Sequence, residues 1–236
     1  VAKKLEKYDS KTLTKIKPQK TVHSISSLLS NTLSYNNISN MKMLDQLIEE
    51  VIMSKAETEY KYKETHEYAM TLPKTYYGKG SYLKWIRVGW ALANTGQEMF
   101  LTWLKFSSQN GCRETLCGSD GNFDWSNVPE LYEMWLGFDF KNPDSLTHRS
   151  IMYWSKNDAP EAYKNIHKQT VNYFIEKTLV RPNEPVTEFD LALILHCIFK
   201  DRFVCVSIKH NCWYEYINNR WSETDSGSEL RKLISL

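Results

Sequence analysis

The 236-residue chain contains no apolar run close to the ~18–20 residues that a membrane-spanning helix needs, so no membrane partner is expected. Cysteine is also scarce: the five residues are an odd number and lack the dense spacing of a disulfide scaffold. This usage predicts free thiols in a reducing compartment. Charge of one sign is lacking too, because the net charge is only +2. Any nucleic-acid surface must therefore come from local clustering of cations.

Motifs of nucleotide and nucleotidyl-transfer chemistry are missing as well. There is no G-x-x-x-x-G-K-[ST] phosphate loop, and GKGS at 78–81 lacks the first glycine and a preceding strand. No pair of strand-borne aspartates suggests two-metal chemistry, and no Ser–His–Asp arrangement can be argued from spacing. We therefore expect no catalytic residue and no cofactor within this chain.

Zinc is the main alternative for a small-molecule or ion site. Thiolates and imidazoles bind zinc tightly, and the residues of these types are Cys112, Cys117, His196, Cys197, Cys205, His210 and Cys212. Their spacing fits no compact zinc finger. Cysteines in apolar runs, such as Cys197 and Cys205, are typical small buried residues. The sequence therefore favours no bound metal.

The remaining composition is that of a folded chain, with 42% hydrophobic residues, 8 Trp, 14 Tyr and 9 Phe. Residues 1–40 are first lysine-rich and then rich in Ser and Asn, which predicts a linker or arm; a phosphate-contacting tail is the alternative. Residues 41–180 carry apolar side chains at helical spacing and are predicted to form a helical module. Three helix starts are expected from capping pairs: Thr95–Glu98, Asn127–Glu130 and Asp158–Glu161.

The C-terminal part, 186–236, follows a short proline-bounded linker at 181–185. Thr187 and Asp190 can cap a helix that runs to about Phe199. Two β-rich runs, 203–208 and 213–217, surround a tight turn near His210, and a last helix is expected after Ser226. The predicted fold class is therefore mainly α: a helical module followed by a small α+β domain with one β-hairpin.

Aromatic and cationic residues alternate along this hairpin. Exposed aromatics beside cations can stack bases and neutralise phosphates. A hairpin is also unstable alone, so some of its aromatics should instead pack on the helix before it. Alternation places Tyr214 and Tyr216 on one face, and Trp213 and Glu215 on the other. The candidate nucleic-acid contacts are Arg202, Lys209, Trp213, Arg220, Trp221 and Arg231.

Two segments resemble parts of known replication proteins. Residues 82–109 (YLKWIRVGWALANTGQEMFLTWLKFSSQ) and the aromatic positions after them are similar to the helical module that follows the polymerase domain of many primases. The matching positions are Trp85, Val88, Gly89, Ala91, Leu92, Trp103, Phe106, Ser107, Trp135 and Trp154. Residues 189–235, with N-x-R-W and a closing L-R-x-x-I-S, resemble the domain that precedes the superfamily-three helicase motor of large DNA viruses (poxvirus, asfarvirus and giant-virus type).

The two resemblances cover about two-thirds of the chain, in the order found in such primase-helicases. They imply a longer parent protein with a primase before this chain and an AAA+ helicase after it. ATP and Mg²⁺ would serve the parent's motor, which works as a hexamer. The chain itself would be a noncatalytic central connector that contacts single-stranded or forked DNA, in the host cytoplasm (a viral factory) or nucleus. A protein-interaction or oligomerisation scaffold without DNA affinity is the alternative.

Overall fold

The computed structural model describes residues 35–57, 59–109, 115–140, 145–180, 185–218 and 220–235. Most of the predicted N-terminal arm, Cys112 and residues 181–184 of the predicted linker lie outside these ranges. The architecture is mainly helical with one small antiparallel sheet near the C-terminal end, which confirms the predicted fold class. None of the helices in the described ranges has the length and apolar character to cross a bilayer.

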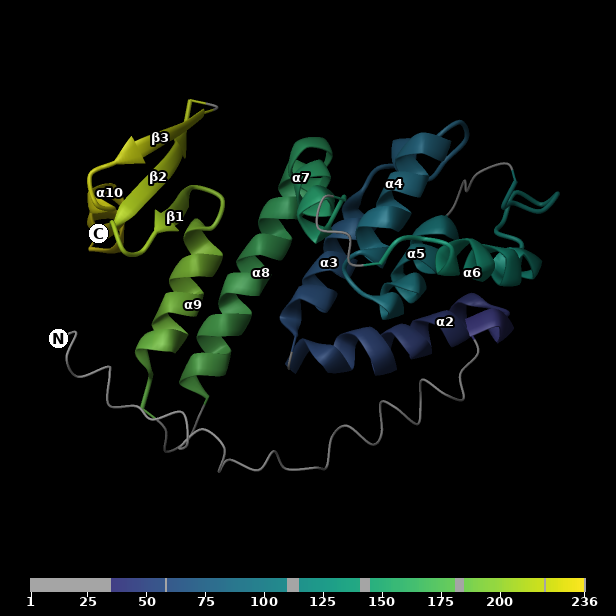
Figure 1. The fold of residues 1–236 in the computed structure, drawn as a ribbon. Helices are drawn as coiled ribbons and strands as arrows, with labels where there is room; N and C mark the ends of the chain where they lie inside the picture. Colours follow the sequence, from purple (N-terminus) through teal and green to yellow (C-terminus); the bar gives the residue numbers. More distant parts are fainter. Residues whose placement is uncertain are drawn as a thin grey trace, which may run out of the picture.

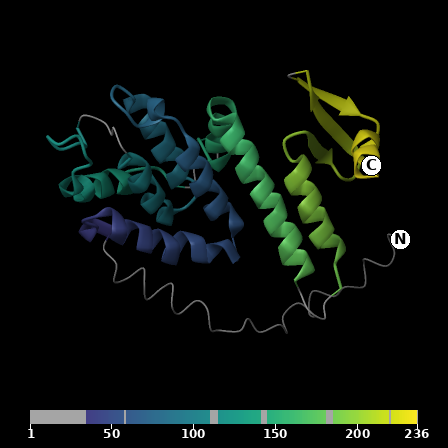
Figure 2. The same ribbon diagram turned by 180° about the vertical axis from the view of Figure 1, so that it is seen from behind.

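The helical body contains α2 (Met41–Ile48), α3 (Tyr60–Thr71), α4 (Tyr82–Ala93), α5 (Phe100–Ser107), α6 (Val128–Leu136) and α7 (His148–Asp158). Two long elements follow, α8 (Pro160–Leu179) and α9 (Glu188–Phe199). In Figures 1 and 2, α8 lies between α3 and α9, so the chain is layered from the body outward to the sheet. Within the first part of the predicted helical module, a π turn (Glu49–Met53) and a 3-10 turn (Ser54–Glu57) separate α2 from α3.

The core of the body is an aromatic stack. Trp85 and Trp103 are fully buried, with ring centroids 4.7 Å apart, and Trp135 packs on Trp103 at 5.7 Å. Gly89 lets Trp103 approach the backbone of α4: a Cβ added there would lie 2.9 Å from the Trp103 ring. A glycine at this position of α4 thus permits the close packing of α4 on α5. The predicted apolar stripes are also buried, including Val88, Leu92, Phe100, Leu104, Leu131, Tyr163 and Ile166.

The end of the predicted arm belongs to this core. Residues 35–37 form a 3-10 turn, and Tyr35 packs on Phe100 and Tyr132 with centroids 5.8 and 5.6 Å away. Ile38 is buried, and the side chain of Asn40 caps α2 by accepting from the Met43 amide. Residues 35–40 of the predicted arm therefore pack against the helical body, which the polar composition of this segment does not indicate.

The predicted capping pairs formed at some helix starts and not at others. Thr187 and Asp190 form the expected reciprocal capping box of α9. Asn127 and the helix after Asp158 show no side-chain cap, and Thr95 instead donates to the Ala91 carbonyl in α4. Ser226 does not cap α10 (Ser228–Ile234) either, since Gly227 occupies that position. The helix starts themselves lie close to the predicted places, since α6 begins at Val128 and α8 at Pro160, but the expected side-chain caps do not form. The Thr95 hydroxyl and the Asp158 carboxylate have other partners.

The capping box of α9 gives the first testable prediction. Thr187→Ala removes the hydroxyl that accepts from the Asp190 amide, and should lower the free energy of unfolding by about 1 kcal/mol. Thr187→Ser keeps the acceptor and should stay within about 0.5 kcal/mol of the unmodified chain. Urea denaturation followed by circular dichroism measures both. Equal losses for the two variants would show that the hydroxyl does not stabilise the helix.

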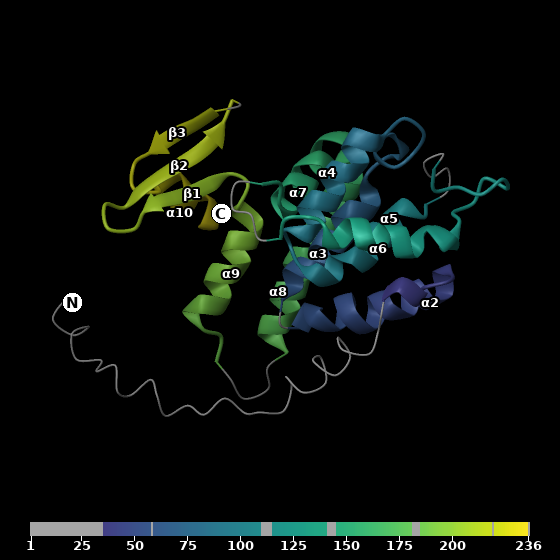
Figure 3. The same ribbon diagram turned by 45° about the vertical axis from the view of Figure 1, so that its right-hand side comes forward.

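The sheet has three strands in the order β1 (Phe203–Ser207), β2 (Cys212–Ile217) and β3 (Arg220–Thr224). The predicted hairpin is β1–β2, with a register shift between Cys205 and Ser207. The third strand was missed because its sequence, RWSET, has few β-branched or apolar residues; its pairing with β2 defines it. The sheet lies at the far end of α9, and α10 lies next to it in Figure 3.

Candidate polar junction and nucleic-acid interface

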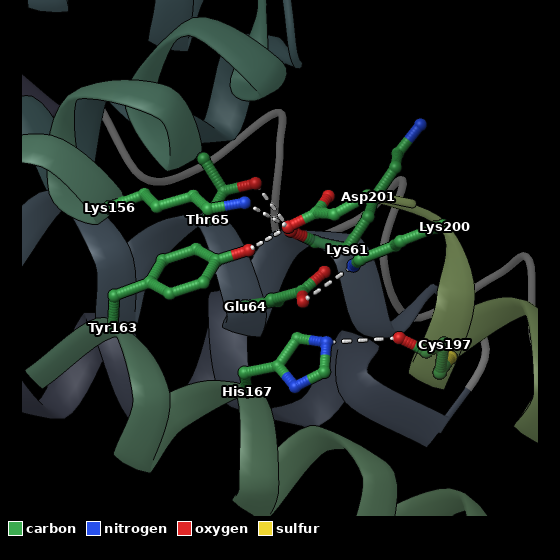
Figure 4. A network of polar contacts seen from close by, with 9 residues as sticks. All are labelled: Lys61, Glu64, Thr65, Lys156, Tyr163, His167, Cys197, Lys200 and Asp201. Atoms are coloured by element: carbon green, nitrogen blue, oxygen red, sulfur yellow. Dashed lines mark hydrogen bonds and ion pairs between the residues drawn. The ribbon is translucent and has the colours of Figure 1, made fainter. Parts of the chain in front are cut away.

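A network of polar contacts joins the helical body to the segment between α9 and β1 (Figure 4). It involves side chains from α3, α7 and α8 on one side and residues 197–201 on the other. We call this network the polar junction. Its members on the body side are Glu64, Lys156, Tyr163 and His167, and its members near the end of α9 are Cys197, Lys200 and Asp201.

Lys200 and Glu64 form the most buried ion pair of the junction. Their charged atoms, Nζ and Oε1, lie 3.0 Å apart, and the side chains are only 18% and 10% exposed. An ion pair with so little solvent contact is screened weakly and depends strongly on both partners being present. The pair therefore fixes the end of α9 against α3, although 136 residues separate the two in sequence.

Asp201 is held by two donors from the body. The Tyr163 hydroxyl donates to its carboxylate at 2.5 Å, and Lys156 Nζ lies 3.2 Å from the same oxygen. Burial alone would raise the pKa of Asp201, but the Tyr163 hydrogen bond and the Lys156 charge outweigh it and lower that pKa. Burial and the same hydrogen bond raise the pKa of Tyr163, so the phenol stays protonated and keeps donating.

His167 completes the junction at the last turn of α9. Its Nε2 atom lies 3.0 Å from the Cys197 carbonyl oxygen. Because a carbonyl only accepts, this contact places the proton on Nε2. The carbonyl belongs to the final four of α9, which have no partner within the helix. His167 therefore satisfies a helix end and ties α8 to α9 at the same time.

The sheet presents one open face, which we define by Val204, Val206, Tyr214, Tyr216 and Trp221 and call the outer face. Its apolar residues are far from buried: Val206 is 58%, Tyr216 42% and Trp221 48% exposed. Tyr216 and Trp221 are cross-strand neighbours with ring centroids 5.2 Å apart. The opposite face packs inward, where Phe203 contacts Phe199 of α9 and Glu215 is buried.

The predicted nucleic-acid residues fall into two groups at opposite ends of the sheet. Arg220 and Trp221 lie at the β2–β3 end, and the Arg202 carbonyl accepts from the Tyr216 amide there. Arg220 is exposed and forms no ion pair with any described residue. The guanidinium of Arg202 is engaged, since Nη2 lies 2.7 Å from Glu215 Oε1.

The second group consists of Lys209, Trp213 and Arg231, and the last two contact other parts of the protein. Trp213 lies on the inward face, 3.3 Å from the position that a Cβ on Gly227 would take, and its Nε1 donates to Asn211. Arg231 donates to the Ser226 carbonyl and so secures the start of α10. Lys209 lies exposed in the β1–β2 turn. The structure therefore brings Trp221 together with Tyr216 on the outer face. Arg220 lies at the same end of the sheet, but it pairs with Ile217, so alternation sets its side chain on the opposite face. Lys209, Trp213 and Arg231 lie elsewhere.

The sequence analysis did not predict the junction, and it did not include Tyr216 among the nucleic-acid contacts. It did place Tyr216 on the face opposite Trp213, and the strand pairing agrees with that placement. No local pattern marks Glu64, Tyr163 or His167, which are ordinary helix residues in sequence. Their role depends on the packing of α3 and α8 against the end of α9.

The cysteine and histidine residues form no metal cluster in the part of the chain that the structure describes, where no group of three or more His, Cys, Asp or Glu side chains is suited to an ion. Cys197, Cys205 and Cys212 are free thiols. Cys117 is disulfide-bonded, so the expectation of free thiols is wrong for this residue. Burial raises the pKa of the Cys197 thiol and keeps it in the unreactive, protonated form.

Known proteins with similar sequences come from large DNA viruses. The chain is 28% identical over 154 residues to a protein of Acanthamoeba polyphaga mimivirus named "putative helicase", which covers 65% of this chain and 14% of that protein. It is 26% identical over 155 residues to a "putative helicase" of Frog virus 3, covering 64% of this chain and 14% of the relative. A "putative primase" of African swine fever virus also matches at 26% over 155 residues, covering 64% of this chain and 15% of its own length.

The chain is thus similar to one region of large-DNA-virus proteins that are named putative helicase or putative primase. The resemblance inferred from the tryptophan and hairpin motifs is thereby confirmed. No protein-family model matches the chain. Because the chain spans only about one-seventh of these relatives, their names describe proteins with much more sequence than is present here.

Proposed function

We propose that this chain is a noncatalytic connector of a viral DNA primase-helicase, which couples primase to a hexameric helicase and contacts single-stranded or forked DNA. The polar junction is the observation that carries the coupling role. It makes the sheet module and the helical body one mechanical unit, through contacts from three helices to residues 197–201. ATP and Mg²⁺ would be bound by the longer protein's motor, and the names of the viral relatives support this setting.

The outer face of the sheet supports the DNA-contacting role. Tyr216 and Trp221 offer two exposed rings side by side, and the exposed Arg220 precedes Trp221 at the start of β3, on the opposite face. Flat aromatic groups with a cation nearby can hold a single strand without reading its sequence. Of the six residues predicted from sequence, Trp221 has the most suitable surroundings, and Tyr216 joins it.

Trp221→Ala provides the test of this face. It removes one stacking platform and should weaken binding of fluorescein-labelled oligothymidylate about tenfold, since a stacked base contributes roughly 1–3 kcal/mol. Arg220→Ala should weaken binding and also flatten its dependence on salt, because a phosphate contact releases counterions. Fluorescence anisotropy at several salt concentrations measures both effects.

The matched control is Tyr82→Ala, an exposed aromatic at the start of α4, away from the sheet, which should change the affinity by less than about twofold. Circular dichroism verifies that each variant is folded. Unchanged affinity of both sheet variants would reject the outer face as a DNA contact. Absence of any binding to single-stranded or forked DNA at low salt would reject the DNA-contacting role entirely.

The exposed surface of α9 favours a second candidate function, a protein-interaction or oligomerisation scaffold. This helix is apolar around much of its circumference but packs mainly on α8, and Phe189, Leu191 and Ile198 are 74%, 52% and 40% exposed. A helix of this kind is normally covered on all sides. Self-association of the chain in sedimentation velocity, abolished by Phe189→Ser and accompanied by no DNA binding, would favour the scaffold over the DNA-contacting connector.

A further inference from the structure

A shallow depression of about 380 Å³ lies between α4 and α7, away from the sheet and the polar junction. Its lining residues are Arg87, Leu146, Arg149, Ser150, Tyr153 and Trp154. We call it the α4–α7 groove. The two helices are packed neighbours and lie side by side in Figures 1 and 3, so the groove is a fixed feature of the body.

The groove carries positive charge that the described part of the protein does not neutralise. None of its six lining residues is acidic, and neither Arg87 nor Arg149 forms an ion pair with a described residue. Asp158, at the other end of α7, instead accepts from the Tyr76 hydroxyl. Ion pairs hold Lys55, Lys105, Lys156 and Lys200 elsewhere in the body, whereas both arginines of this depression lack such a partner among the described residues.

The position of Arg149 is electrostatically unfavourable for the fold itself. It lies in the first turn of α7, which contains no acidic residue, although the partial positive charge of a helix start favours anions there. Neutral side chains supply the cap, through the Thr147–Ser150 capping box. A cation at a helix start lowers stability unless an anion offsets it, and no described residue forms an ion pair with Arg149.

Aromatic side chains accompany both arginines. Tyr153 follows Arg149 by one helical turn and is 65% exposed, and Trp90 follows Arg87 by nearly one turn and is 43% exposed. The Arg87 guanidinium lies 5.5 Å from the centre of the Trp154 ring, which orients it at the groove. Each helix therefore presents a cation followed by an exposed ring. In a bound single strand, the cation can contact a phosphate and the ring can stack on a base.

We propose that the α4–α7 groove is a second binding site for single-stranded nucleic acid, with phosphodiester groups at Arg87 and Arg149 and a base stacked on Tyr153. This goes beyond the proposed function, because it uses another surface and none of the residues of the sheet. The presence of two arginines and no acidic residue in the lining favours a polyanionic ligand. The exposed aromatic rings favour a polyanion that also carries bases.

The test compares two charge-matched double variants of the whole chain. Arg87→Gln with Arg149→Gln should weaken oligothymidylate binding at least tenfold. It should also reduce the slope of log K against log salt by about 1.4, at about 0.7 per phosphate of a single strand. Lys42→Gln with Lys168→Gln removes the same charge from exposed sites elsewhere and should change affinity by less than about twofold. Tyr153→Ala should weaken binding about fivefold with the slope unchanged.

Binding at the α4–α7 groove can be distinguished from binding at the outer face of the sheet. Loss of affinity in Trp221→Ala but not in the arginine double variant would overturn the groove and leave the sheet standing, and the opposite pattern would overturn the sheet alone. Equal losses in the two charge-matched variants would show only a general charge effect and overturn the groove. Displacement of oligothymidylate by poly-glutamate of equal charge, at equal concentration, would identify an acidic protein as the ligand and also overturn it.

Discussion

Lys200→Met is expected to lower the free energy of unfolding by about 3 kcal/mol, because it leaves the carboxylate of Glu64 without its partner. The carboxylate side chain is only 10% exposed, so water can replace the lost ammonium poorly. Methionine keeps the length of the lysine stem and most of its packing, which confines the change to the charge. Urea denaturation of both proteins measures the difference.

The companion variant separates the ion pair from packing. Removing both charges, with Lys200→Met and Glu64→Gln, should destabilise less than Lys200→Met alone, since no uncompensated charge remains. Lys164→Met is the matched control: its ion pair with Glu161 is 69% and 82% exposed and should contribute at most about 0.5 kcal/mol. If Lys200→Met costs no more than Lys164→Met, the junction pair is screened by solvent and does not fix α9.

Gly89→Ala is expected to destabilise the helical body by about 2 kcal/mol. Alanine is a better helix former by about 1 kcal/mol, but its Cβ would lie 2.9 Å from Trp103 Cε2 and 3.0 Å from Phe138 Cε2. Trp103 cannot retreat, because it is fully buried between Trp85 and Trp135. Overpacking of this kind typically costs 1–3 kcal/mol or more and exceeds the gain in propensity.

Gly137→Ala is the control for this substitution. Gly137 has an ordinary helical φ of −80°, and an added Cβ would meet its nearest atom at 3.4 Å, a normal contact. Its effect should stay within about 0.5 kcal/mol. The shift in thermal midpoint, followed by circular dichroism, compares the two variants. If Gly89→Ala is as stable as Gly137→Ala, the Trp103 ring can shift to accommodate the added Cβ at little cost in stability.

The placement of the candidate site shows where long-range contacts override local chemistry. Asp158 lies one residue before the N-cap position of α8, which Ala159 occupies, and its carboxylate accepts from the hydroxyl of Tyr76, 82 positions earlier in the chain. Trp213 carries the same stacking potential as Trp221, yet it packs inward against Gly227 while Trp221 faces solvent. Composition alone cannot distinguish two tryptophans of one sheet; the face of the strand and what covers that face decide their roles.

The sequence by itself determined what depends on neighbours along the chain. Apolar periodicity indicated the helical body, the turn near His210 located the hairpin, and the spacing of Thr187 and Asp190 marked the start of α9. Only the tertiary structure decided that Glu64, Tyr163 and His167 would meet residues 197–201, and that Arg87 and Arg149 would share one groove. Local patterns are set by backbone geometry over a few residues, whereas these contacts exist only once helices from distant segments have packed.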